Sequence, residues 1–388
     1  ADSAETAATN PAGIIRFNER AVAGELMWFT SESEWESEFC NTGGEFNSKD
    51  STDTLVPRIY YVEPLTDRLS ASFTILGFGF SDDLGEWPGR YFMKSYDSVN
   101  VSAFPSLAYR INDQWSVAGS LALTYSKFEQ ERAVRNFFDP GYRDGKSELE
   151  TDGFEVGFGL STLYQMSERT RWGLTYQSEI EPDQDGDSDF SGLGPNTEAV
   201  FERLGIIGAD ITVESTSPQS VLAGVYHEFY NDHAVTVDLA WIDFSKFRLS
   251  EYYFNGQAFA ENDTDYDDIY AVSASYSWPV SERWMLSAGA MYVSDLVEDE
   301  DRIFLLRLDD IWGLGFAAEW DWSKGRKIDI NFSYLDLGEA PIESPPLPFI
   351  GSVTGAYSQH DLFLLRVGLS LSLIHISEPT RLRRKSRM

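Results

Sequence analysis

The chain has 388 residues, a formal net charge of −33 and an aromatic content of 14%. So negative a chain excludes the nucleic-acid-binding class, because phosphate binding needs clustered Lys and Arg. No apolar run approaches the ~20 residues of a transmembrane helix, so any crossing of a membrane would be made by strands. The single cysteine, Cys40, excludes an internal disulfide, and four His without paired spacing predict no transition-metal site.

Taken in chain order, the sequence alternates strand patterns with polar links. Residues 1–13 have no strand period, and Asn10-Pro11-Ala12-Gly13 is a turn signal. Strands are predicted wherever apolar residues recur with a period of two. The predicted strands are 22–30, 55–62, 69–79, 99–110, 115–128, 154–160, 172–180, 211–229, 235–241, 270–278, 284–294, 311–321, 328–334 and 360–370.

The clearest of these patterns is the hairpin at 104–125. In its second strand the large residues Trp115, Leu121 and Tyr125 share one face, whereas Ser116 and Ala118 begin a face of small and polar residues. An apolar face bracketed by aromatic residues is typical of a strand with lipid outside and a lumen inside.

The links between the fourteen predicted strands alternate strictly between short and long; the short ones are turns of about four to six residues, of which 167–170 is the turn before strand 172–180. Outer-membrane barrels have an even strand number, short periplasmic turns and longer external loops. Lipid admits only helices or closed barrels, because every backbone donor and acceptor must be paired. The sequence therefore predicts an all-β protein, a 14-stranded antiparallel transmembrane barrel in contact with outer-membrane lipid and lipopolysaccharide, and a monomer.

Several short motifs carry a resemblance to a known family. They are Asn10-Pro11-Ala12-Gly13, Val56-Pro57, Tyr60 to Asp67, Trp87-Pro88-Gly89-Arg90-Tyr91, Pro105 to Asp113, Tyr176-Gln177-Ser178 and Ser217-Pro218-Gln219. In this order and spacing they resemble the FadL family of outer-membrane transporters for long-chain fatty acids and other hydrophobic compounds.

The resemblance implies a barrel whose N-terminal segment folds inside as a hatch, with Asn10, Pro11 and Ala12 in the hatch motif and most of the hatch upstream of this chain. It also implies capture of substrate in an external groove, passage to an interior site and release sideways through the wall. The family often has Pro-Phe-Gly after the third strand, whereas this chain has Gly77-Phe78-Gly79, which puts the details of the wall opening in doubt.

Apolar residues in the long loops are candidates for capturing the substrate, because solvent would otherwise disfavour them there. The alternative is that these loops pack on each other and cap the barrel. The candidates are Phe137, Phe138, Val200, Phe201, Leu204, Ile206 and Ile207.

Two further loop features have competing interpretations. Arg90 and Tyr91 could contact a carboxylate headgroup, since a guanidinium binds carboxylates in a bidentate manner, but Arg90 could equally pair with a loop acid. The acidic stretch 183–189 invites a calcium interpretation, yet its glycine falls at the fourth position and position twelve is Gly194, so an acidic loop is preferred.

The function that we expect is passive uptake of hydrophobic molecules across the bacterial outer membrane, without a cofactor. A general diffusion porin or a structural barrel is the alternative, and an outer-membrane lipase is the third reading. No Gly-x-Ser-x-Gly motif is present, and the expectation is that the protein is not an enzyme.

The chain divides into a residual hatch segment at 1–21, the barrel at 22–370 and a tail at 371–388. The stretch 371–381 resembles the conceptual translation of a sequencing-library adapter, and the tail has five basic residues against one acid. We expect the tail to be non-native; a functional basic tail is the alternative. The start of the chain, which has neither an initiator Met nor a signal peptide, is expected to be processed or truncated.

Overall fold

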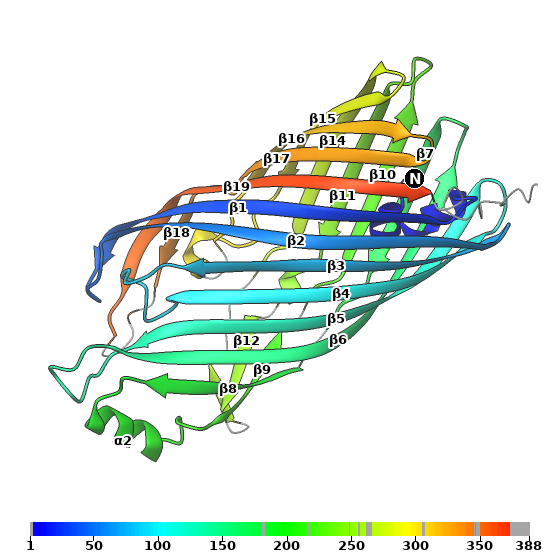
Figure 1. Cartoon of the computed structure of the whole chain (residues 1–388). Helices are drawn as coiled ribbons and strands as arrows, with labels where there is room; N and C mark the ends of the chain where they lie inside the picture. The colour runs from blue at the N-terminus through cyan, green and yellow to red at the C-terminus, as the bar shows by residue number, and fades with distance from the viewer. Residues whose placement is uncertain are drawn as a thin grey trace, which may run out of the picture.

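The computed structural model describes residues 3–180, 183–215, 217–247, 249–254, 257–260, 266–304, 307–344, 346 and 350–372. The strands of this part of the chain form one continuous antiparallel sheet that closes on itself around the N-terminal segment (Figure 1). Among the same residues, no helix is long and apolar enough to cross a membrane.

Fourteen strands of the described residues make the wall, each hydrogen-bonded to the next and the last paired to the first. In ring order they are β1 (Ala21–Cys40), β2 (Asn47–Thr66), β3 (Leu69–Asp83), β4 (Ser95–Arg110), β5 (Trp115–Val134), β6 (Gly145–Gln165), β7 (Thr170–Gln177), β10 (Ser220–Glu228), β11 (Ala234–Ile242), β14 (Ile269–Ser281), β15 (Trp284–Val293), β16 (Ile311–Ser323), β17 (Arg326–Asp336) and β19 (Val353–Ser372). The ring closes where Ala21 pairs with Ser372. The predicted 14-stranded barrel is confirmed.

Shorter elements sit at the ends of the wall. The additional strands are β8 (Asp183–Ser191), β9 (Asp210–Ser215), β12 (Leu249–Phe254), β13 (Gln257–Ala260) and β18 (Ala340–Glu343), and the helices are α1 (Thr6–Thr9), η1 (Pro11–Arg16), α2 (Pro195–Arg203), η2 (Phe244–Lys246) and η3 (Asp299–Asp301). Strand β8 pairs with residues 146–152 of β6, at the long-loop end of the wall. Strands β9, β12 and β13 then continue this sheet, each paired with the one before it.

The two faces of the wall follow the predicted alternation. On β5 the side chains of Val117, Leu121 and Tyr125 are exposed, whereas Ser116 and Ala118 are buried. Exposed large apolar side chains continue around the ring on the same face of its neighbours, including Leu107 of β4 and Phe154 of β6. The outer face therefore presents an apolar belt to lipid, as expected for an outer-membrane barrel.

The strands extend further from the lipid than the sequence pattern predicts. The predicted link between strands 22–30 and 55–62, with its polar loop at 39–54, is wrong for most of its length, because β1 runs to Cys40 and β2 begins at Asn47. The acidic stretch 183–189, predicted as a loop, is strand β8 and pairs with β6. Beyond the lipid both faces of a strand meet solvent, so polar residues occur on both faces and the sequence shows no alternation of apolar and polar residues. The backbone hydrogen bonds to the neighbouring strand are made there all the same.

The predicted strand 211–229 is also wrong, because it is two strands with different partners. Strand β9 pairs with β8 and β12, whereas β10 returns to the wall between β7 and β11. Pro218 lies between them, where its missing N–H costs the ladder nothing. At the C-terminus β19 continues to Ser372, two residues past the predicted end, and the rest of the predicted tail lies outside the described residues.

Candidate functional site

The N-terminal segment lies inside the barrel, and the predicted hatch motif is where it turns. Asn10 separates α1 from η1, and its side-chain oxygen accepts a hydrogen bond from the Ala12 amide at 3.1 Å. Pro11 occupies the first helical position, where a missing N–H is tolerated. The side-chain nitrogen of Asn10 donates to the Thr162 carbonyl of β6 at 3.0 Å, so the residue that shapes the turn also attaches the turn to the wall.

Further hydrogen bonds attach this turn to β5 and β6. The Ala12 amide donates to the Ser161 hydroxyl at 3.0 Å, and the Ser116 hydroxyl donates to the Ala12 carbonyl at 2.9 Å. Gly173 of β7 lets the segment approach, since a Cβ there would lie 2.3 Å from the Asn10 side-chain nitrogen. Small inward residues on the wall therefore create the space that the segment fills.

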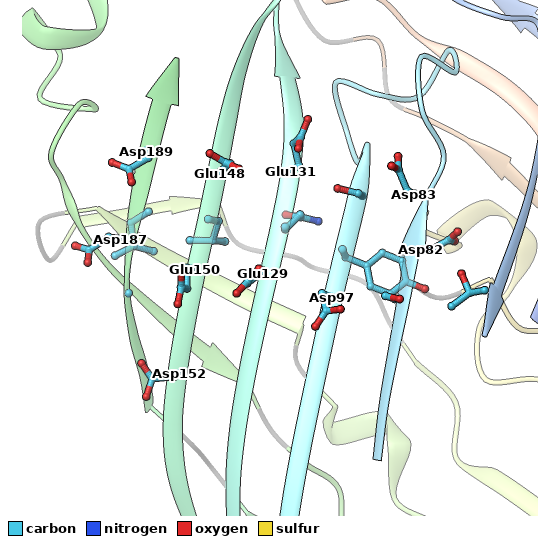
Figure 2. A pocket seen from close by; sticks show the side chains of 18 of the residues that line it. Asp82, Asp83, Asp97, Glu129, Glu131, Glu148, Glu150, Asp152, Asp187 and Asp189 are labelled. Carbon is cyan, nitrogen blue, oxygen red and sulfur yellow. The ribbon is translucent and has the colours of Figure 1, made fainter. Parts of the chain in front are cut away.

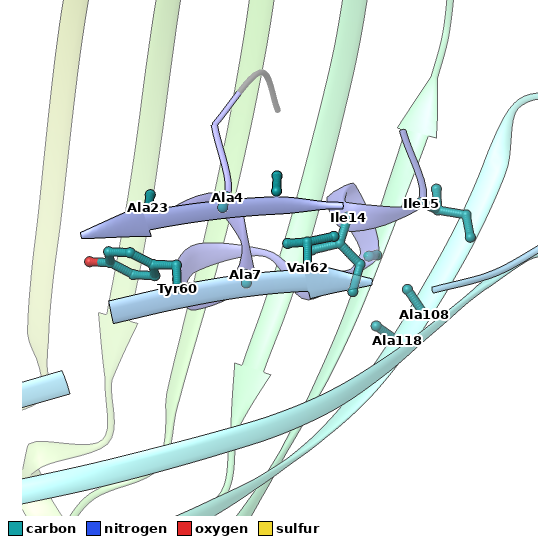
Figure 3. Packing of buried hydrophobic residues seen from close by; sticks show 11 residues of the cluster. Ala4, Ala7, Ile14, Ile15, Ala23, Tyr60, Val62, Ala108 and Ala118 are labelled. Atoms are coloured by element: carbon teal, nitrogen blue, oxygen red, sulfur yellow. The ribbon is translucent and has the colours of Figure 1, made fainter. Parts of the chain in front are cut away.

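Apolar packing completes this attachment (Figure 3). The cluster contains Ala4, Ala7, Ala12, Ile14 and Ile15 of the segment with Ala21, Ala23, Tyr60, Val62, Ala108 and Ala118 of β1, β2, β4 and β5. All of these residues are buried, and the wall contributes mostly alanine. The segment is thus packed against the wall as tightly as a protein core, not suspended in a lumen.

A charged cluster attaches the beginning of the segment to the neighbouring part of the wall. Arg366 of β19 lies 3.1 Å from Glu25 of β1, 3.5 Å from Asp329 of β17 and 3.7 Å from Glu5 of the segment. The Tyr60 hydroxyl donates to Glu25 at 2.9 Å. Burial, followed by the Glu25 and Asp329 carboxylates, raises the pKa of Glu5 to about 7, while Arg366 opposes them. One guanidinium therefore serves three carboxylates, one of which belongs to the N-terminal segment.

The lumen beside this cluster is lined by apolar side chains. Met27, Phe29 and Val56 are buried on the inner face of β1 and β2, with Leu362 and Leu364 of β19 packed against them. We call these five residues the apolar lumen patch. Sequence reasoning did not single them out, because inward apolar residues on β1 and β19 are indistinguishable from ordinary strand positions until the barrel is closed.

The wall divides next to this patch. Pairing between β2 and β3 ends at Arg58 and Leu76. Beyond that point β2 stays with β1 as far as Asn47, while β3 stays with β4 as far as Asp83. We call the unpaired stretch the β2–β3 split.

Aromatic side chains of β3 follow the split. Phe78 and Phe80 have the same parity as the buried Ser72 and Thr74 of β3, which places them on the inner face. The two rings lie 5.8 Å apart, and Phe80 lies 5.3 Å from the ring of Tyr96 on β4. Although the chain lacks the Pro-Phe-Gly of many relatives, β3 leaves β2 without any break in its own pairing to β4.

Arg90 and Tyr91, predicted as possible headgroup contacts, lie in the β3–β4 loop and bind residues of the neighbouring β1–β2 and β5–β6 loops. The Arg90 guanidinium lies 3.0 Å from Asp144 and 2.6 Å from the Gly43 carbonyl, and the Tyr91 hydroxyl donates to Asp144 at 2.7 Å. Burial, followed by the hydrogen bond to Asp144, raises the pKa of Tyr91 to about 12. Of the two interpretations, the structure shows the pairing with a loop acid; a role in headgroup contact remains a prediction.

The predicted capture residues lie in two loops that are joined to each other. Asp139 of the β5–β6 loop accepts hydrogen bonds from the Asn196 and Thr197 amides at 3.0 and 2.8 Å and thereby caps α2. Burial would raise the pKa of Asp139, but these hydrogen bonds outweigh it and lower the pKa.

Around this junction the candidate side chains differ in exposure. The Phe137 and Phe138 rings, 5.6 Å apart, are about half exposed, and Leu204 is exposed. Phe201 packs at 5.5 Å on Phe190, and Val200, Ile206 and Ile207 are half-buried. The structure therefore brings both loops together, with part of the set exposed as capture requires and part packed as a cap requires.

An acidic groove of about 1180 Å³ crosses the long-loop ends of β3 to β6 and β8 (Figure 2). Its acids include Asp97, Glu129, Glu150 and Asp187. Strand register places these four in one row across β4, β5, β6 and β8. Lys127 lies 2.6 Å from Glu129 and 2.7 Å from Glu150, so part of the repulsion is offset. No apolar substrate is expected to bind in so polar a groove.

Comparison with known proteins places this architecture in a family. The family model described as "Outer membrane protein transport protein (OMPP1/FadL/TodX)" matches residues 1–358. The chain belongs to this family. It is therefore an outer-membrane β-barrel of the FadL/TodX type, and the predicted resemblance and localisation are confirmed.

Individual relatives are distant in sequence but similar along their whole length. A long-chain fatty acid transport protein of Escherichia coli O6:H1 is 25% identical, over 86% of this chain and 81% of that protein. One from Salmonella typhi is 20% identical, over 90% and 85%.

Solved structures share the fold. A Pseudomonas aeruginosa FadL homologue has a TM-score of 0.86 at 15% identity, covering 95% of this chain and 93% of that one. The Pseudomonas putida toluene transporter TodX has a TM-score of 0.64 at 15% identity, covering 94% and 92%.

Proposed function

We propose that this protein takes up long-chain fatty acids or other hydrophobic compounds passively across the outer membrane. The observation that carries the proposal is the arrangement inside the barrel: the N-terminal segment packs on the inner face of β1, β2, β4 and β5, and the same strands β1 and β2 carry the apolar lumen patch and border the β2–β3 split. A molecule that enters from the loops meets apolar side chains, the packed segment and a break in the wall. The names of the relatives support a hydrophobic substrate.

In this proposal the exposed loop residues Phe137, Phe138 and Leu204 desolvate the ligand first. The N-terminal segment, with Asn10, Pro11 and Ala12 at its turn, acts as the hatch, because its hydrogen bonds to β5 and β6 are local and can break without opening the ring. The ligand then leaves sideways through the β2–β3 split, where backbone pairing is already absent. No step requires a cofactor.

A diffusion porin is the alternative that the strands alone left open. A porin keeps a water-filled lumen, whereas here a segment with buried alanine and isoleucine side chains is packed on the inner face of the wall, which favours a gated path. The belt of exposed apolar side chains meets membrane lipid, and we expect a monomer.

The deciding experiment compares two assays on the same preparation. Uptake of a labelled hydrophobic compound is measured in cells that lack a transporter of this class, and sugar permeation is measured by swelling of proteoliposomes. We expect saturable hydrophobic uptake and slow swelling. Rapid swelling without saturable uptake would establish the porin instead.

A further inference from the structure

A buried ion pair fastens the β15–β16 loop to the end of β3. Arg307, four residues before β16, is buried and pairs with Asp82 of β3, which is buried as well. The same guanidinium donates to the Tyr96 hydroxyl of β4 at 3.1 Å and lies over the Tyr357 ring of β19, 4.6 Å from its centre. In ring order β17, β19, β1 and β2 lie between β16 and β3, so this contact joins distant parts of the wall.

The ion pair lies along the β2–β3 split. Asp82 is six residues beyond Leu76, the last residue of β3 that pairs with β2, and it also lines the acidic groove (Figure 2). Beyond Asp82, the Ser48 hydroxyl of β2 donates to the Leu84 carbonyl at 3.2 Å. Since the ladder between β2 and β3 ends at Leu76, side-chain contacts such as these hold this edge of β3 in place.

The two charges are incompletely satisfied. Among the described residues, neither Oδ1 of Asp82 nor Nη1 of Arg307 finds a hydrogen-bond partner, although both atoms are buried. Burial of two charges costs free energy that their attraction offsets only when the remaining donors and acceptors are also bonded. If the edge of β3 moved away from the loop, both groups would meet water in the adjoining groove and regain hydrogen bonds. The closed arrangement is therefore favoured by a small margin.

We propose that Arg307 and Asp82 form a releasable clasp, which keeps the β3 edge of the split closed and widens the opening in the wall when it separates. This rests on the proposed function, in which the ligand leaves through the β2–β3 split. The clasp acts on the wall at its long-loop end, whereas the N-terminal segment packs on the inner face of β1, β2, β4 and β5. The exit thus has a control of its own.

The test measures the width of the split in the full chain in lipid nanodiscs, by double electron–electron resonance between two spin labels. The labels are attached through Asp53→Cys on β2 and Ser81→Cys on β3, in a Cys40→Ser background. These two positions would be opposite each other if the register of Arg58 and Leu76 continued along both strands. Without further substitutions the labels should give one main, short distance.

Substitution of one partner and of both partners should have opposite effects. Arg307→Met leaves the Asp82 carboxylate buried without its cation, which should raise the ratio of open to closed molecules by roughly a hundredfold and add a longer distance. Asp82→Leu combined with Arg307→Met removes both charges and should restore the short distance, because an apolar pair has no charge to hydrate. The control Lys49→Gln breaks the ion pair with Glu34 on β1 and should leave the distances unchanged.

Each outcome decides one part of the proposal. An unchanged distance in Arg307→Met would overturn the clasp, and a double variant as open as the single one would overturn its release, since the ion pair would then stabilise the closed arrangement outright. If Arg307→Met does not give a folded barrel, Asp82→Leu alone takes its place, because it leaves the guanidinium without its carboxylate. The distances report the clasp whether or not a hydrophobic compound is imported, so a failed uptake assay would overturn the proposed function and leave this measurement valid.

Discussion

The hydroxyl pair that holds Ala12 offers the most direct measurement of how firmly the N-terminal segment is attached. The double variant Ser116→Ala, Ser161→Ala removes the wall hydrogen bonds to the Ala12 carbonyl and amide, at 2.9 and 3.0 Å, and leaves the hydrogen bond from Asn10 to Thr162 in place. Both serines are buried, so water does not replace them readily.

The expected magnitude follows from what the substitution leaves behind. The Ala12 amide keeps its hydrogen bond to the Asn10 side-chain oxygen, so only the Ala12 carbonyl loses its wall partner outright, and the double variant weakens the packed segment by about 1–3 kcal/mol. At ~1.4 kcal/mol per tenfold, the released population rises by roughly tenfold to a hundredfold. Asn10 and the apolar cluster remain in place, and the wall keeps its ladder, so the barrel itself stays folded.

Hydrogen exchange of residues 6–16 in nanodiscs measures this population. Exchange there should accelerate while exchange in β5 and β6 stays slow. Ser102→Ala is the matched control, because it removes a serine hydrogen bond of 2.8 Å to Thr124 on the same wall without touching the segment. Unchanged exchange in the double variant, or equal acceleration in the control, would refute the idea that these bonds hold the segment.

Three further predictions concern single residues. Because the pKa of Glu5 is raised from 4.5 to about 7, its contribution to packing is complete below pH 4.5 and is lost as pH rises through 7. The protection factors of the segment, which correct for the intrinsic pH dependence of amide exchange, should fall over that range, and Glu5→Gln should abolish this fall. Gly173→Ala should destabilise the packed segment by about 1–3 kcal/mol, because the added methyl group would clash with the Asn10 side chain. The segment should then be released at a lower urea concentration than in the wild type, and an unchanged midpoint would contradict the prediction. Asp139→Ala should uncap α2, so limited proteolysis should cut near Asn196 faster, with an unaltered barrel band on a denaturing gel; equal cutting rates would show that the cap is dispensable.

Strand number and orientation could be predicted from the sequence because lipid imposes a strict rule on each membrane-crossing strand. The outward face must be apolar, as with Leu121 and Phe154, and the alternation therefore survives in the amino-acid order. Strand residues outside the membrane need no apolar outward face. For this reason the sequence pattern predicts a loop at β8 and a single strand across β9 and β10.

The candidate sites divide in the same way. The Asn10-Pro11-Ala12 turn was predicted because its residue types shape the backbone locally, and the structure places it inside the barrel. The interpretation of Arg90 could not be decided beforehand, because its partner, Asp144, is 54 residues away in the chain.

The sequence by itself determined that this is a barrel of fourteen strands, because the alternation of faces and the alternation of short and long links are properties of neighbouring residues. Only the tertiary structure decided what the barrel encloses. The apolar lumen patch, the carboxylates around Arg366 and the β2–β3 split all depend on register between strands that are distant in sequence or on where that register stops. A lumen exists only once the first strand meets the last, and its chemistry is then set by side chains that no local pattern brings together.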